Sequence, residues 1–172
     1  AFLGIIVLFF APSPVDAQYF GQNKMRYKKL NFKVYDTPHF NVYYYLQNDS
    51  MMHWLAKESE VWYELHQQVL QDTFLRKNPI IFYNIHPEFQ QTTATQGEIS
   101  SGTGGFTEAF KQRVVMPIAQ TNHQTRHVLG HELVHAFQYR MLMEGSDSTR
   151  LENVGNIPLW MIEGMAEYFS IG

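Results

Sequence analysis

The order of apolar and polar residues predicts short strands first and helices later in the chain. Apolar and polar residues alternate in segments 32–36 and 40–45, which predicts two strands joined by a short turn. Apolar runs at 80–85 and 113–118, with a glycine-rich stretch at 102–107 between them, predict three more strands. We therefore expect an α+β domain built on a mostly antiparallel sheet.

Segment 50–74 has the periodicity of a long helix. Its apolar residues recur at steps of three, four or their sums, which predicts one buried face against the sheet. These residues are Met51, Leu55, Trp62, Leu65 and Val69.

Two further helices are predicted towards the end of the chain. The first begins at Thr121, because Thr121 and Gln124 have the spacing of a capping box, and it ends at Gly145. The second covers 159–169, after a proline suited to a first helical turn. We expect Trp160 and the apolar residues that follow it to lie in the core.

Composition limits the chemistry that this chain can perform. It has no cysteine, so any bound metal must be held by His, Asp or Glu. Its 13 Lys and Arg against 16 Asp and Glu give a net charge of -3, and we expect no nucleic-acid partner.

Residues 1–17 have the pattern of a secretory signal peptide. An apolar run, too short to cross a bilayer, is followed by small residues at Val15 and Ala17. We predict an N-terminally incomplete signal peptide over 1–17, a single C-terminally truncated domain over 18–172 and no transmembrane span. The protein is therefore expected to be exported, to the periplasm, the cell envelope or the medium.

The candidate chemistry lies in the helix that begins at Thr121. His131, Glu132 and His135 form an H-E-x-x-H motif. Residues four apart on a helix are one turn apart, so both imidazoles can reach one metal ion while Glu132 lies beside it. This spacing predicts a Zn²⁺ site in which Glu132 is the general base that accepts a proton from the metal-activated water.

A glutamate-bearing helix follows, with the residues W-M-I-E-G-M-A-E-Y at 160–168. With this stretch, the chain resembles the gluzincin-type (peptidase MA-like) zinc metallopeptidases, and in particular the domain that precedes a Tol-type beta-propeller in secreted bacterial proteins. The resemblance implies a zincin-like fold, a peptide or protein substrate, one Zn²⁺ ion and a possible C-terminal beta-propeller.

The resemblance also implies roles for individual residues. Glu163 matches the third metal ligand, and Glu167 matches the carboxylate that receives the outer N–H of His131. The strand at 113–118 resembles the one beside the cleft, and Gly104, Gly105, Phe106 and Thr107 resemble the edge strand that pairs with an extended substrate. No oxyanion-stabilising residue is assigned, because gluzincins supply it downstream of the third ligand.

Geometry and spacing exclude two other histidine-based metal sites. His127 cannot share an ion with both other histidines, because it lies two turns from His135, about 12 Å along the axis. A metzincin site would need Gly at 138 and His at 141, where this chain has Gln138 and Met141. The other histidines are expected to be polar or capping residues. The second function hypothesis is a catalytically inactive zincin-like binding or scaffold module attached to a beta-propeller in the cell envelope. The intact Glu132 argues against it, because a scaffold does not need the base.

Overall fold

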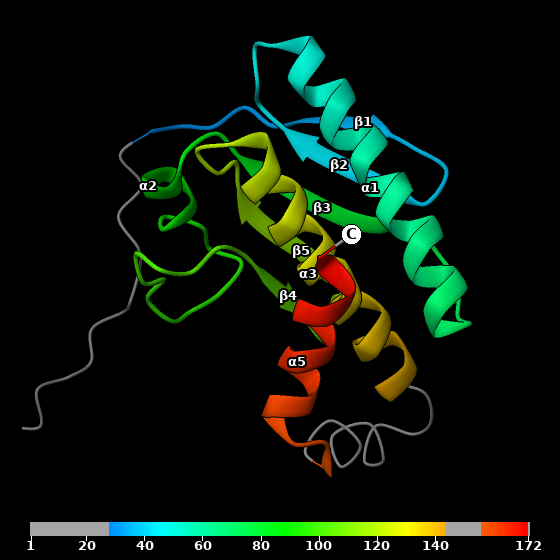
Figure 1. The fold of residues 1–172 in the computed structure, drawn as a ribbon. Helices are drawn as coiled ribbons and strands as arrows, with labels where there is room; N and C mark the ends of the chain where they lie inside the picture. Colours follow the sequence, from blue (N-terminus) through cyan, green and yellow to red (C-terminus); the bar gives the residue numbers. More distant parts are fainter. Residues whose placement is uncertain (1–27, 144–155, 172) are drawn as a thin grey trace, which may run out of the picture.

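The sheet has a mixed strand arrangement in the computed structural model, which describes residues 28–143 and 156–171 (Figure 1). Its five strands lie in the order β1-β2-β3-β5-β4. They are β1 (Lys33–Asp36), β2 (Phe40–Tyr44), β3 (Asn78–Tyr83), β4 (Phe106–Glu108) and β5 (Arg113–Pro117). The predicted signal peptide and the predicted helix end at Gly145 lie outside the described residues.

The prediction of a mostly antiparallel sheet is wrong. The pairs β1/β2 and β4/β5 are antiparallel, whereas β2/β3 and β3/β5 are parallel. The antiparallel pairs are those joined by short turns. Long connections return the chain to the same end of the sheet, and these connections produce the parallel pairs.

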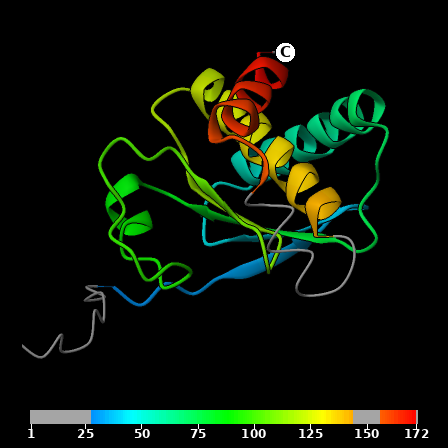
Figure 2. The same ribbon diagram turned by 90° about the horizontal axis from the view of Figure 1, so that it is seen from below.

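Three longer helices lie on one side of the sheet, with α5 packed on α3 (Figure 2). They are α1 (Asp49–Leu70), α3 (Asn122–Leu142) and α5 (Leu159–Ser170). The Asn48 side chain caps α1 by accepting hydrogen bonds from the backbone N–H groups of Ser50 and Met51. Helix α3 has its N-cap at Thr121, which confirms the predicted start. The short α2 (His86–Phe89) was not predicted.

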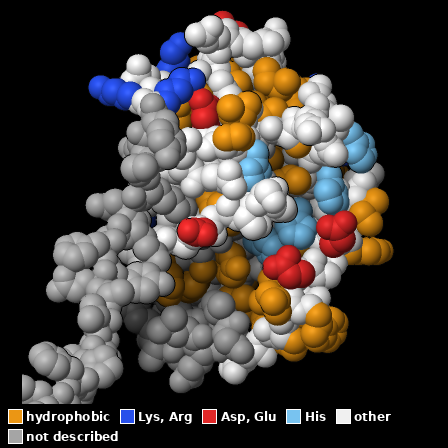
Figure 3. Space-filling view, turned by 90° about the vertical axis from the view of Figure 1, so that its left-hand side faces the viewer, with side chains coloured by type: hydrophobic (Ala, Val, Ile, Leu, Met, Phe, Trp, Pro, Cys, Tyr) orange, Lys and Arg blue, Asp and Glu red, His pale blue; other side chains and the backbone are white. Residues whose placement is uncertain are grey.

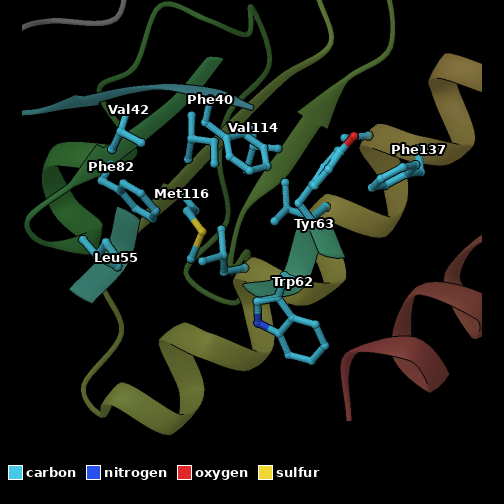
Figure 4. Packing of buried hydrophobic residues seen from close by; sticks show 13 residues of the cluster. Phe40, Val42, Leu55, Trp62, Tyr63, Phe82, Val114, Met116 and Phe137 are labelled. Atoms are coloured by element: carbon cyan, nitrogen blue, oxygen red, sulfur yellow. The ribbon is translucent and has the colours of Figure 1, made fainter. Parts of the chain in front are cut away.

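The main core lies between the sheet and helices α1 and α3 (Figure 4). Alternate residues of the three central strands point towards the helices, as the two-residue period of a strand requires. These residues are Phe40, Val42, Ile80, Phe82, Val114 and Met116. On the opposite face, Tyr83 and Val115 pack with Phe89 and Ile99. The strands β3 and β5 are therefore buried on both faces.

The predicted apolar faces of two helices need correction. In α1, Leu65 and Val69 are 40% and 54% exposed, whereas Tyr63 and His66 are buried. Trp160 was expected in the core, but it is 76% exposed at the start of α5. Other predicted core residues of the two helices, such as Trp62 and Ile162, are buried. The apolar residues alone therefore define each buried face only in part.

Within the described residues, no helix is both long enough and apolar enough to span a membrane.

Candidate metal centre and active site

Two histidines of α3 bring their ring nitrogens together. His131 and His135 lie one turn apart, and their rings meet edge to face with centroids 4.8 Å apart. The Nε2 atoms of the two rings are separated by 3.1 Å. The four-residue spacing predicted this approach, because it is a local property of a helix.

Helix α5 adds a carboxylate to the same point. Glu163 Oε2 lies 3.3 Å from His131 Nε2 and 3.5 Å from His135 Nε2. Ile162 and Ala166, the residues on either side of Glu163 on the inner face of α5, are buried. This packing holds α5 beside α3 and directs Glu163 at the two rings. The structure thus brings together the three residues that the sequence nominated as ligands.

The spacing of the three atoms fits tetrahedral coordination. In tetrahedral zinc sites with bonds of about 2.0–2.1 Å, ligand atoms lie about 3.3 Å apart. The three observed distances bracket this value. Among the described residues, this is the one group of three or more metal-binding side chains whose ligand atoms gather this closely.

Neighbouring side chains contact the outer nitrogens of both histidine rings. Gln138 Nε2 donates to the Ile162 carbonyl at 3.0 Å, so Gln138 Oε1 faces His135 and accepts from its Nδ1 at 2.8 Å. His131 Nδ1 faces Glu167 Oε2 at 3.4 Å. His135 therefore places its proton on Nδ1, which leaves the lone pair of its Nε2 directed at the site. The two Nε2 atoms and Glu163 Oε2 converge on one point, an arrangement that a bound cation would stabilise.

The surroundings of His131 favour its neutral form. Burial is the largest cause that lowers the pKa of His131, and the neighbouring His135 adds to it, although Glu163 and Glu167 oppose this change. A neutral imidazole is the form that binds a metal.

The Glu132 carboxyl lies at the floor of the site, with the residue only 5% exposed. The Thr107 hydroxyl donates to Glu132 Oε2 at 2.8 Å and also lies 2.9 Å from the Glu132 backbone oxygen. Burial raises the pKa of Glu132 to about 7, with a smaller contribution from Glu163, while Thr107 and His135 act in the opposite direction. A carboxyl with a pKa near neutrality is suited to accept and return a proton.

A cleft of about 460 Å³ opens over these groups. Its walls are residues 102–107, before and within β4, and the facing sides of α3 and α5. Figure 3 shows histidine and acidic side chains gathered on this side of the molecule. No Lys or Arg is among the described residues that line the cleft, so its charged groups favour a cation.

The predicted substrate-strand residues have different positions in this wall. Gly104 and Gly105 line the cleft, and a Cβ atom on Gly105 would lie 3.1 Å from Glu132 Cγ. The Phe106 ring packs on Phe89, with centroids 5.7 Å apart. Thr107 points its hydroxyl at Glu132. At the end of the strand order, β4 is an edge strand.

Two residues near the site, Gln138 and Tyr139, were not assigned these positions from the sequence, whereas His127 was expected around the site or on the surface. Gln138 departs from the metzincin motif, and its three-residue spacing from His135 is the local signal that predicts their contact. Tyr139 lines the cleft, and its ring stacks on His135 with centroids 6.0 Å apart. His127 Nε2 lies 3.4 Å from Glu167 Oε1, on the far side of that carboxylate from His131.

Comparison with known proteins bears on this region of the chain. A family model described as "Peptidase of plants and bacteria" matches residues 87–171. The match supports a peptidase-like domain. The matched stretch runs through β4, β5, α3 and α5, and it contains every described residue that lines the cleft. No curated protein and no solved structure matches the chain significantly.

Proposed function

We propose that this protein is a zinc-dependent peptidase with His131, His135 and Glu163 as metal ligands. The observation that carries the proposal is the convergence of three acceptor atoms, 3.1 to 3.5 Å apart, on one side of a cleft. The family match supports the peptidase part of the proposal. When bound, zinc supplies Lewis-acid chemistry, which makes water a nucleophile near neutral pH and polarises a carbonyl.

Residues of the cleft would carry out the proton transfers and position the substrate. Glu132 accepts a proton from the attacking water and returns it to the nitrogen of the departing amine. Its buried position beside Thr107 keeps the carboxyl pointed into the cleft. An extended peptide can pair with the outer edge of β4, which would place the peptide backbone across the cleft. The signal-like segment at 1–17 supports an exported enzyme.

The metal assignment is tested by elemental analysis of the purified full-length protein. We expect one zinc per chain in the wild type and loss of zinc in His135→Ala, because two remaining ligands cannot hold the ion. His123→Ala, which removes an exposed histidine of the same helix, is the matched control and should keep the metal. Metal-free wild type, or full zinc occupancy in His135→Ala, would contradict the assignment.

The catalytic assignment is tested with Glu132→Gln. This substitution keeps the size of the side chain and its contact with Thr107, but it removes the base. We expect zinc content and thermal stability close to those of the wild type, while peptide hydrolysis falls at least about a hundredfold. A zinc-loaded wild type that cleaves no member of a diverse peptide library, or that cleaves no faster than Glu132→Gln, would favour the scaffold hypothesis.

A further inference from the structure

Strand β4 contacts the proposed general base directly. The Thr107 hydroxyl lies 2.8 Å from Glu132 Oε2 and 2.9 Å from the Glu132 backbone oxygen. Both contacts are with Glu132. The Thr107 hydroxyl therefore bridges the Glu132 carboxylate and the backbone of α3. No hydrogen bond to the other oxygen, Glu132 Oε1, comes from the described part of the chain.

Gly105, two positions before Thr107, leaves room for the Glu132 side chain because it has no Cβ atom. A Cβ atom on Gly105 would lie 3.1 Å from both Glu132 Cγ and Glu132 Oε1, and 3.1 Å from Met116 Cβ. Residues two apart in an extended chain face the same side, so Gly105 and Thr107 both face Glu132. Phe106, between them, turns its ring to Phe89 on the opposite side.

We propose that Gly105 and Thr107 form a cradle that holds Glu132 in its productive rotamer, with Thr107 as a positioning residue. This inference rests on the proposed function. A glutamate side chain without contacts samples several rotamers. The Thr107 hydroxyl at Oε2 and the Gly105 backbone beside Oε1 leave few of these rotamers accessible to Glu132. Thr107 holds Oε2, and Oε1 stays available to take the proton.

The kinetic test compares two substitutions of Thr107. Thr107→Val keeps the shape and removes the hydroxyl, and we expect kcat to fall about tenfold with KM nearly unchanged, the size of effect expected for a hydrogen bond to a charged group. Thr107→Ser keeps the hydroxyl and should restore most of kcat. In the Glu132→Gln background, Thr107→Val should cause no further loss, because the residue acts through Glu132.

A matched control separates this role from a structural one. Thr37 is buried in the turn between β1 and β2, and its hydroxyl makes two hydrogen bonds with the Phe40 backbone. Thr37→Val should lower the free energy of unfolding without changing kcat. A Thr107→Val enzyme with wild-type kcat, or one whose loss persists in the Glu132→Gln background, would overturn the cradle.

Crystal structures of the variants test the cradle without relying on activity. We expect the Glu132 carboxylate to leave its wild-type position in Thr107→Val and in Gly105→Ala. Gly104→Ala is the control, because its Cβ would meet Val128 Cγ2 at 3.2 Å and not Glu132. An unmoved carboxylate in both test variants would refute the cradle. If the wild type cleaves no peptide, the proposed function fails, and these structures still decide whether the cradle exists.

Discussion

At the scale of single residues, Glu163 and Glu167 show how one turn of helix changes the environment of a carboxylate. Glu163 reaches the Nε2 atoms of two histidines, whereas Glu167 lies between the outer sides of His127 and His131. In the proposed metal site, Glu163 is a ligand and Glu167 orients one. Loss of an outer partner of a ligand histidine typically weakens metal binding by about 10- to 100-fold.

We therefore predict an order of zinc affinities. Glu167→Ala should weaken zinc binding by tens-fold, and Glu163→Ala should weaken it more, because it removes a ligand. Glu64→Ala, at an exposed position on α1, is the control for loss of one negative charge. Competition titration against a chelator of known affinity gives the three values. The reverse order for Glu163 and Glu167 would mean that the ligand is one turn away from the residue proposed here.

The sequence could predict those contacts of the site that a single helix determines. His131 and His135 meet because they are four residues apart on α3. The bond from Thr107 to Glu132 joins residues 25 positions apart, and it depends on how β4 lies against α3. No local pattern reports that distance. The role of Thr107 therefore became visible only in three dimensions.

At the scale of elements, the prediction placed the start of α1 within one residue, but it ended the helix at Phe74 instead of Leu70 and misjudged part of the buried face. Counting apolar residues alone placed Leu65 and Val69 in the core, where the structure buries Ser59 and His66. Trp62 anchors α1 to α3, because its indole N–H donates to the Arg126 carbonyl at 2.9 Å. This hydrogen bond sets the rotation of α1 against α3. With that rotation, Ser59 and His66 face the interior.

The crossing of α1 and α3 requires a glycine on α3. A Cβ on Gly130 would lie 2.6 Å from Trp62 Cε2, and Trp62 is fully buried. Gly130→Ala should therefore destabilise the fold by about 1–2 kcal/mol, since overpacking outweighs the gain in helix propensity of about 1 kcal/mol. Chemical denaturation measures this change.

Gly164, on α5, provides the matched comparison. A Cβ there would meet no atom within 4 Å. Gly164→Ala should therefore raise the free energy of unfolding by about 0.5–1 kcal/mol, because the alanine gains helix propensity without a clash. The two glycine variants should thus change stability in opposite directions. Equal signs would mean that Trp62 can move aside and that the crossing is not fixed by this contact.

At the scale of the whole molecule, a single buried histidine connects the outer helices. His66 of α1 stacks on Trp62, with ring centroids 5.2 Å apart, and its Nε2 lies 3.3 Å from the Phe169 carbonyl of α5. Its Nδ1 is buried without a hydrogen-bond partner in the described part of the chain. Protonation of Nδ1 would therefore place a charge between α1 and α5 that no group in the described part of the chain compensates.

This position makes the stability of the fold depend on pH. Burial lowers the pKa of His66 from 6.5 to about 4, so the unfolded chain takes up a proton at a higher pH than the folded one. The resulting stabilisation is complete above pH 6.5 and is lost as the pH falls towards about 4. The loss amounts to at most about 3 kcal/mol at the lower limit.

The variant His66→Gln tests this dependence, because glutamine can still donate to the Phe169 carbonyl but does not titrate. We expect the difference in unfolding free energy between wild type and His66→Gln to shift against the wild type as the pH falls from 6.5 to about 4. Taking the difference cancels the opposite effect of Glu132, whose raised pKa favours the folded state at lower pH. His123→Gln, at an exposed site on α3, controls for the loss of a histidine. If the difference stays constant across this range, His66 does not govern the acid limit of the fold.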